Sequence, residues 1–249
     1  MGSGTVPMSA PEVPISDAAT VIVARDTSEG LQVFMVRRSA RAVFLPDQYV
    51  FPGGRVDDAD RAAAARRLHG SAGDVDPAYA ITAARETFEE VGLLFADRPV
   101  HVAELAGLRR SMHAGAMSFA DVLERLDVSI DASQLHYFSR WITPKAEMAT
   151  RRFDARFFVG RAPEDQVAEA DATEVLDGRW IAPADALAAN ARGEINLIFP
   201  TIKHLERVAP YPTVDELLAF ARTKTIVTVS PDVQPGPKFL LVPELENAW

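Results

Sequence analysis

The 249-residue sequence contains no cysteine, which excludes disulfide bonds and thiol chemistry. Because the lack of disulfides fits a reducing compartment, we expect a cytoplasmic protein. No stretch approaches the roughly 20 consecutive apolar residues that cross a bilayer, so no membrane partner is expected. The Gly-, Ser- and Pro-rich residues 1–14 lack the basic and apolar regions of a signal peptide, and we expect them to be disordered.

Positive charge is scarce as well. Lys and Arg total 26 against 35 Asp and Glu, which gives a formal net charge of −9. A uniformly basic surface for nucleic acid is therefore not expected. An anionic small substrate would need a local arginine cluster and metal ions to overcome this field.

Several common metal and phosphate signatures are missing. None of the five histidines has a partner at metal-ligand spacing, and no Glu-x-x-His occurs, which argues against zinc and di-iron sites. The sequence also lacks a Gly-Lys-Ser/Thr P-loop and a Gly-x-Gly-x-x-Gly fingerprint. Phosphate binding should therefore depend on metal ions, and we expect the histidines to be structural or exposed.

The most informative feature that is present is a run of carboxylates in residues 83–93, Ala-Ala-Arg-Glu-Thr-Phe-Glu-Glu-Val-Gly-Leu. Glu86, Glu89 and Glu90 stand three and four residues apart, which places them on one face of a helix. The opposite face carries apolar residues, namely Ile81, Ala84, Phe88 and Val91. We therefore expect a helix that is held to a core by its back and presents carboxylates from its front.

Carboxylates at this spacing repel one another. With Cβ atoms roughly 5–6 Å apart and an effective dielectric of about 20, two unit charges repel by roughly 3 kcal/mol. A raised pKa or a bound cation relieves the repulsion, and oxygen ligands favour Mg²⁺ or Mn²⁺ over zinc. Arg85 can pair with Glu89 and orient it. The alternative interpretation is an ordinary solvated acidic face.

A glycine bend precedes the predicted helix. Tyr49–Phe51 has the aromatic and β-branched residues of a strand, and it runs into Pro52, Gly53 and Gly54. The proline stops the strand ladder, and the glycines let the backbone turn and approach a ligand. An exposed carbonyl there could complete an oxygen cage, although Pro-Gly-Gly by itself would be an ordinary turn.

Together these residues resemble the Nudix box, the signature of hydrolases that cleave a nucleoside diphosphate linked to another moiety. The family pattern is Gly, five residues, Glu, seven residues and then Arg-Glu-aliphatic-x-Glu-Glu-x-Gly-aliphatic. Gly54 matches the first glycine, and residues 85–93 match the second half. Asp60 stands where the first Glu belongs, Thr87 replaces an aliphatic residue, and a spacer longer than seven residues indicates that an insertion splits the box.

Further segments are similar to the Nudix subfamily that includes the mammalian peroxisomal coenzyme A diphosphatase, which also has an interrupted box. In chain order they are Phe44–Pro46, Val50–Gly54, Asp57–Asp60, Arg85–Glu90, Trp141–Pro144 and Thr150–Asp154. The resemblance implies an α/β/α sandwich with a mixed sheet and extra helical insertions. We expect one such domain over residues 15–249, with insertions at about 61–79 and 100–135.

Residue patterning predicts the elements of this sandwich. Strands are expected at 18–24, 31–37, 136–142, 152–159 and 174–181, with short strands at 225–230 and 239–243. Helices are expected at 61–68, from Pro77 onward with Asp76 as N-cap, and at 101–126, 183–191, 200–208 and 214–222.

Arginines are the candidates for substrate binding, because the guanidinium group grips phosphate in a bidentate fork. Arg37, Arg38 and Arg41 follow the second predicted strand, where the alternative is a solvated cluster. Arg151 and Arg152 match the subfamily pattern, but neighbours on a strand point to opposite faces, so both should not serve one site. We take Arg38 and Arg152 as the substrate-binding residues.

The resemblance implies one more metal-binding or catalytic glutamate in a loop after the box, and we assign this role to Glu174. Its rivals in the same acidic loop are Glu164, Asp165, Glu169 and Asp171. Glu86, Glu89, Glu90 and Glu174, with the carbonyl of Gly54, would hold two or more Mg²⁺ or Mn²⁺ ions. Arg85 would orient the cluster, and either Glu174 or Glu89 would act as the base.

The resemblance therefore predicts a metal-dependent diphosphatase whose partner is a small nucleoside diphosphate derivative. Coenzyme A or an acyl derivative is the first substrate expected, with ADP-ribose or NADH as the alternative. A hypothesis of another class is a non-catalytic Nudix module that binds a nucleotide metabolite. Nudix proteins often dimerise, so a homodimer is compatible with the resemblance.

Overall fold

The computed structural model describes residues 13–40, 45–145, 151–172, 174–234, 238–241, 243–246 and 248–249. Residues 1–12, and with them most of the N-terminal segment predicted to be disordered, lie outside this part. So do Arg41, Phe44 and Thr150, which the sequence analysis names as a phosphate contact and as parts of the subfamily pattern.

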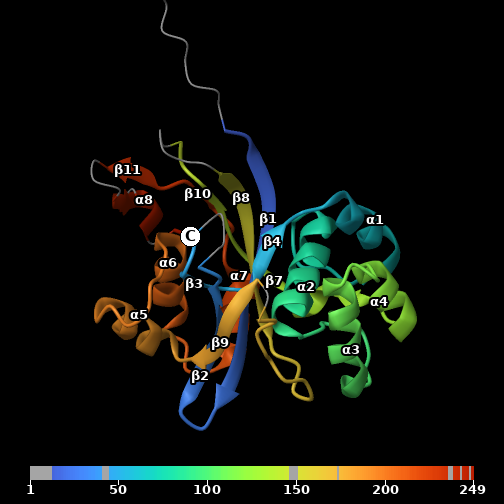
Figure 1. Cartoon of the computed structure of the whole chain (residues 1–249). Coiled ribbons are helices and arrows are strands. Elements are labelled where there is room, and N and C mark those ends of the chain that lie inside the picture. Colours follow the sequence, from blue (N-terminus) through green and yellow to red (C-terminus); the bar gives the residue numbers. More distant parts are fainter. Residues whose placement is uncertain are drawn as a thin grey trace, which may run out of the picture.

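A mixed sheet forms the centre of the molecule (Figure 1). In the described part of the chain it has eight strands, in the order β10-β7-β8-β1-β2-β3, with β4 beside β1 and β9 beside β2. The strands are β1 (Ile15–Thr27), β2 (Gly30–Arg38), β3 (Tyr49–Val50), β4 (Gly53–Arg55), β7 (His136–Ile142), β8 (Arg152–Arg161), β9 (Val175–Ile181) and β10 (Thr228–Val229). Strand β1 runs parallel to β8 and antiparallel to β2 and β4.

Helices cover both faces of this sheet (Figure 1). One face carries α1 (Asp58–Arg67), α2 (Pro77–Val91), α3 (Val102–His113) and α4 (Phe119–Leu126), and the other carries α5 (Pro183–Ala191), α6 (Phe199–Val208) and α7 (Val214–Thr223). Along β1, Val21 and Val23 pack in the first core, whereas Ile22 and Ala24 pack in the second. This period of two is that of a strand buried on both faces, and the predicted α/β/α sandwich is confirmed.

Short elements complete the described structure. They are β5 (Leu68–His69) paired with β6 (Ile130–Asp131), a 3₁₀ turn at Ala132–Gln134, the hairpin of β11 (Asp232–Gln234) and β12 (Lys238–Leu240), and α8 (Pro243–Glu246). Among the described helices, none combines the length and apolar character that crossing a bilayer requires.

Three predicted elements differ from the structure. Residues 101–126 form two helices instead of one, because the chain turns between them and Gly115 adopts a φ of +68°. Pro52 does end β3, but Gly53 and Gly54 begin β4 and pair with β1 instead of forming a free turn. Pro243 begins α8 instead of ending a strand, which suits the fixed φ of proline in a first helical turn.

Helix α2 forms as the sequence predicts. The carboxylate of Asp76 caps its first turn by accepting from the N–H of Ala78 at 2.9 Å, and Pro77 follows as the first helical residue. The helix ends at Gly92, whose φ of +81° is the left-handed conformation that favours glycine. Its apolar back is fully buried, and α1, which includes most of the helix expected in the first predicted insertion, packs directly against α2.

Candidate functional site

The acidic face of α2 is largely buried, which distinguishes it from a solvated acidic face. Glu90 is 5% exposed, and the side chains of Glu86 and Glu89 are 12% and 27% exposed. Burial raises the pKa of Glu86 to about 7, against the opposing charge of Arg85. Burial and the charge of Glu86 raise the pKa of Glu90 well above its usual value, against the N–H group of Gly53.

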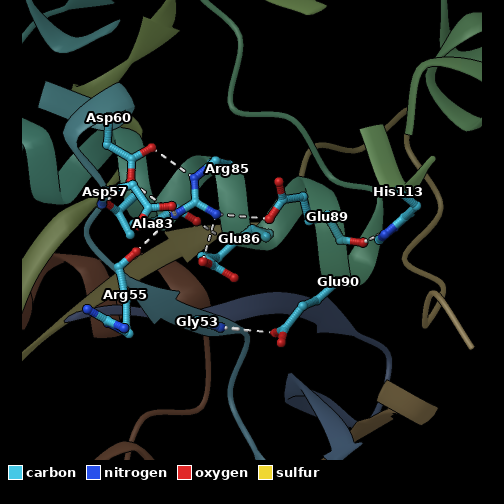
Figure 2. A network of polar contacts seen from close by, with 12 residues as sticks. Gly53, Arg55, Asp57, Asp60, Ala83, Arg85, Glu86, Glu89, Glu90 and His113 are labelled. Carbon is cyan, nitrogen blue, oxygen red and sulfur yellow. Dashed lines mark hydrogen bonds and ion pairs between the residues drawn. The ribbon is translucent and has the colours of Figure 1, made fainter. Parts of the chain in front are cut away.

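Arg85 is the centre of the polar network in Figure 2. Its Nη1 donates to Glu86 and Glu89 at 2.8 and 2.9 Å, and its Nη2 donates to the carbonyl of Arg55 at 2.9 Å. Its Nε and Nη2 form a fork onto the two oxygens of Asp60, at 2.8 and 2.9 Å. Burial alone would lower the pKa of Arg85, but these carboxylates raise it above its usual value, so the guanidinium stays charged.

The carboxylate of Asp60 accepts hydrogen bonds from Arg85 and lies outside the cavity wall. It is buried, and besides the Arg85 fork it accepts from the hydroxyl of Thr82 at 2.8 Å and from the N–H of Asp57 at 3.0 Å. The bonds from Thr82 and Asp57 hold the carboxylate of Asp60, which in turn orients Arg85, and Asp60 does not line the neighbouring cavity. The residue at the position of the first box Glu therefore contacts Arg85 instead of the cavity.

The glycine bend lies directly against the acidic helix. The N–H of Gly53 donates to a carboxylate oxygen of Glu90 at 3.1 Å (Figure 2). A Cβ atom on Gly54 would stand 2.2 Å from Oε1 of Glu86, so a side chain at this position would collide with the carboxylate. The bend thus serves close packing, and the role of the Gly54 carbonyl as a metal ligand stays a prediction.

A cavity of about 750 Å³ opens beside these groups. One part of its wall is charged and includes Glu86, Glu90, Glu174 and Arg38. Aromatic side chains from several elements form much of the remaining wall: Phe51, Trp141, Phe153, Phe157, Phe199 and Phe239. The cavity therefore offers both a polar surface for phosphate chemistry and an apolar surface for another part of a ligand.

Glu174 lines the cavity. The four other acidic residues considered for its role do not: Glu164, Asp165, Glu169 and Asp171. Glu174 and Glu90 line the same cavity, and the charge of Glu174 adds to the burial and the charge of Glu86 that raise the pKa of Glu90. Asp171 has a supporting position, because its carboxylate accepts from the N–H groups of Glu174 and Val175 at 3.1 and 3.0 Å.

Glu89 and Arg152 lie elsewhere than the sequence analysis places them. Glu89 does not line the cavity, and its carboxylate accepts from Arg85. Arg152 is buried, donates through Nε to the carbonyl of Thr143 at 3.1 Å and is not part of the cavity wall, whereas Arg151 is. The structure therefore brings Arg151 and Arg38 to the cavity, but not Arg152.

Sequence reasoning missed some residues that shape this region. Phe199 begins α6 and Phe239 lies in β12, far along the chain from the box, and no local pattern marks them as cavity residues. Arg55 also lines the cavity, next to the predicted bend. The only sequence feature that could have marked Arg55 as a cavity residue is its position directly after Gly54.

Glu86 and Glu90 suit a divalent cation. Both face the cavity, and Arg85 divides its charge among Asp60, Glu86 and Glu89, so the buried negative charge is incompletely compensated, as the raised pKa values show. A hard cation with oxygen ligands would supply the missing charge. In the described part of the chain, no three acidic or imidazole side chains converge as a metal-holding group, so Glu89 or Glu174 would have to turn toward this pair to complete one.

Comparison with known proteins gives consistent relatives. A family model for the NUDT19 Nudix domain matches residues 63–208. Human acyl-coenzyme A diphosphatase NUDT19 is 28% identical over 241 residues, covering 78% of this chain and 64% of that protein. Putative nudix hydrolase 7 of Caenorhabditis elegans is 26% identical over 214 residues, covering 86% of this chain and 67% of that protein. The chain thus spans less than two thirds of the human relative.

A solved structure agrees with these matches. The crystal structure of a Nudix hydrolase from Alicyclobacillus acidocaldarius superposes with a TM-score of 0.68 at 29% sequence identity. The alignment covers 84% of this chain and 97% of that protein.

Proposed function

We propose a reaction for this chain from the premise that the chain belongs to the Nudix hydrolase family, with a Nudix domain of the NUDT19 type. The enzyme hydrolyses the pyrophosphate bond of a nucleoside diphosphate derivative with the help of Mg²⁺ or Mn²⁺. The observation that carries this proposal is the buried pair Glu86 and Glu90, which lines the cavity and whose pKa values burial raises.

Residues of the chain have separate roles in this reaction. Glu86 and Glu90, with Glu174 or Glu89, would hold the cation, which when bound polarises phosphoryl oxygens and lowers the pKa of a water molecule. Arg38, Arg55 and Arg151 line the cavity and would orient the diphosphate and neutralise its charge.

Proton transfer requires a carboxylate that can reach the attacking water, and we assign it to Glu174 or Glu89. Glu174 lines the cavity, which favours it, whereas Glu89 would first have to leave Arg85. The water oxygen bonds to one phosphorus as the bridging P–O bond breaks, and the proton passes to the base. Two phosphomonoesters result, which for coenzyme A are 3′,5′-ADP and 4′-phosphopantetheine.

The apolar part of the cavity bears on the substrate. Trp141, Phe157 and Phe199 offer aromatic surface beyond the charged wall, which suits a substrate with an apolar arm on its diphosphate. An acyl derivative of coenzyme A has such an arm, and the human relative carries the name of an acyl-coenzyme A diphosphatase. We therefore place acyl-CoA and coenzyme A ahead of ADP-ribose and NADH.

A substrate panel tests this proposal. Purified protein is incubated with Mg²⁺ or Mn²⁺ and with acyl-CoA, CoA, ADP-ribose, NADH or nucleoside triphosphates, and the phosphomonoester products are quantified. We expect metal-dependent turnover that is fastest on the coenzyme A compounds. Turnover on none of them would support the non-catalytic binding module instead.

The site assignment is tested by Glu90→Gln, with Glu124→Gln on the exposed face of α4 as the matched control. We expect Glu90→Gln to lower kcat by at least about 10²-fold, because it removes a buried anionic oxygen ligand. Thermal unfolding should stay cooperative in both variants, and Glu124→Gln should keep the kcat of the unchanged protein. Equal kcat in both variants would contradict the assignment.

A further inference from the structure

Arg109 on α3 connects two segments that carry the proposed metal ligands. Its Nε donates to the backbone carbonyl of Glu89 in α2 at 2.7 Å. Its Nη1 donates to the backbone carbonyl of Glu169 at 2.8 Å, in the loop between β8 and β9 that ends at Glu174. One guanidinium group therefore bridges the acidic helix and the loop that brings Glu174 to the cavity.

The C-terminal end of α2 is completed by these neighbours. A helix leaves its last four carbonyls without partners from the helix itself, and here all four accept hydrogen bonds. The N–H of Gly92, the cap residue, donates to the carbonyl of Phe88. The carbonyl of Glu89 accepts from Arg109 and also contacts Nε2 of His113 at 3.0 Å (Figure 2). The carbonyl of Glu90 accepts from the N–H of Asp171 at 3.1 Å, and the carbonyl of Val91 accepts from the N–H of Glu169 at 2.9 Å.

The final glycine of the box leaves room for this bridge. A Cβ atom on Gly92 would stand 3.2 Å from Nη1 of Arg109, closer than side chains usually pack. The third donor group of Arg109, Nη2, is buried and has no hydrogen-bond partner among the described residues. Burial of Nη2 without a partner costs Arg109 part of its hydration. Its Nε and Nη1 bond the carbonyls of Glu89 and Glu169, and no other side chain in the described part of the chain bonds both.

Packing of α3 on the core does not require Arg109. The buried residues of this helix are Leu105 and Leu108, and both belong to the first hydrophobic core. Loss of the guanidinium should therefore leave α3 in place and release only the bridge between α2 and the loop.

We propose that Arg109 is a positioning residue that sets the distance between the carboxylates of α2 and Glu174. The inference rests on the proposed metal-dependent hydrolysis for its effect on activity, while the bridge itself is a property of the protein without metal. Without Arg109, the loop would keep the backbone hydrogen bonds of Glu169 and Asp171 to α2 but lose its tie to the carbonyl of Glu89, so Glu174 would be held less closely to the carboxylates of α2.

Three variants test the bridge. Arg109→Met keeps the aliphatic stem and removes both hydrogen bonds, Arg109→Lys keeps the charge but cannot span two carbonyls, and Arg110→Met at the exposed neighbouring position is the control. Hydrogen exchange of the protein without metal is followed in peptides covering residues 88–94 and 166–176. Mn²⁺ titration and steady-state kinetics are measured on the same preparations.

We expect Arg109→Met to speed exchange at the amides of Glu169 and Asp171 by at least about tenfold while peptides from β1 and β8 keep their protection. The Mn²⁺ concentration for half-maximal activity should rise by about 10–100-fold, and kcat should fall more than KM rises. Arg109→Lys should be intermediate in each measurement, and Arg110→Met should match the unchanged protein.

Unchanged exchange and Mn²⁺ dependence in Arg109→Met would overturn the inference. If Arg109→Met does not fold, Arg109→Lys decides: a folded Lys variant with weakened Mn²⁺ response supports the bridge, and one equal to the unchanged protein overturns it. Absence of turnover in the unchanged protein would instead overturn the proposed function, and the exchange experiment would still decide the bridge.

Discussion

At the scale of single residues, the site depends on the close approach of a glycine to a buried carboxylate. The carboxylate of Glu86 occupies the space where a side chain of Gly54 would be. Arg85 holds Glu86 from the other side, and Asp60 holds Arg85. A small displacement at any of these positions therefore moves the charge that faces the cavity.

We expect Gly54→Ala to lower kcat/KM by about 10²-fold or more, because a shift of about 1 Å in a positioned group has this effect. The new Cβ would stand 2.2 Å from Oε1 of Glu86, so the carboxylate must move. Gly107→Ala in α3 is the control: its Cβ would meet nothing closer than 3.8 Å, and it should raise stability by about 0.5–1 kcal/mol without changing activity. Steady-state kinetics on both variants would contradict this expectation if they lost activity equally.

Residue types and spacing predicted most members of the acidic cluster, but not which contact each side chain makes. The spacing of Glu86, Glu89 and Glu90 is enough to place them on one helix, yet Glu89 turns to Arg85 and away from the cavity wall. Alternation along a strand shows that Arg151 and Arg152 cannot both serve one site, but which of them faces the cavity depends on the register of β8 against β1. That register is a tertiary property, so the sequence could not select Arg151.

At the scale of elements, the two ends of α2 have different origins. Residues adjacent in sequence define its N-terminal end, whereas hydrogen bonds from other elements satisfy the carbonyls of its C-terminal end. Its start depends on Asp76 and Pro77, which are adjacent in sequence, so it could be predicted. At its other end, the last carbonyls accept from Arg109 of α3 and from Glu169 and Asp171 of the loop between β8 and β9, which are distant in sequence. The pairing of β4 with β1 has the same origin, because the Pro-Gly-Gly pattern alone predicts a turn.

Asp76→Ala should destabilise the protein by about 1 kcal/mol, because the first turn of α2 loses its side-chain acceptor. For a domain of this size the melting temperature should fall by about 2–4 °C. The salt bridge of Asp76 with Arg61 adds little, since both side chains are about half exposed.

Thermal unfolding checks this expectation, with Asp74→Ala, an exposed position two residues earlier, as control. The kcat of Asp76→Ala should stay unchanged because the carboxylates lie at the other end of the helix. Equal melting temperatures for the two variants would show that the cap contributes nothing to stability.

At the scale of the whole molecule, the second core contains a buried histidine between the sheet and α6. His204 is fully buried and stacks on Phe157 at 4.0 Å between ring centroids. Its Nδ1 lies 2.6 Å from the carbonyl of Pro200 and its Nε2 lies 2.7 Å from the hydroxyl of Ser139. A neutral ring that donates from Nδ1 and accepts at Nε2 satisfies both contacts.

This histidine makes stability depend on pH. Burial lowers the pKa of His204 to about 3, and the charges of Lys224 and Arg207 act in the same direction. Between about pH 3 and the unfolded value of about 6.5, the unfolded chain binds a proton that the folded chain does not. The free energy of unfolding should therefore rise with pH across this window, by up to about 1.4 kcal/mol per pH unit from this residue, and level off above it.

Urea unfolding at pH 4.5, 5.5 and 6.5 measures this slope in the unchanged protein and in His204→Gln. The Gln variant should be less stable at pH 7, because it loses packing and hydrogen bonds, but its stability should depend less on pH in this window. The remaining carboxylates titrate in both proteins, so the difference between the slopes isolates the histidine. Parallel curves would contradict the expected contribution.

Strand β1 also has a consequence for how the protein is made. It pairs with β8 along residues 15–24 and with β2 and β4 on its other edge. A nascent chain on the ribosome exposes one edge of this apolar strand until residues 152–161 have been translated. Such long-range parallel pairing forms slowly, and open apolar edges invite association between chains. Extra chaperone during synthesis should therefore raise the yield of correctly folded protein in cells.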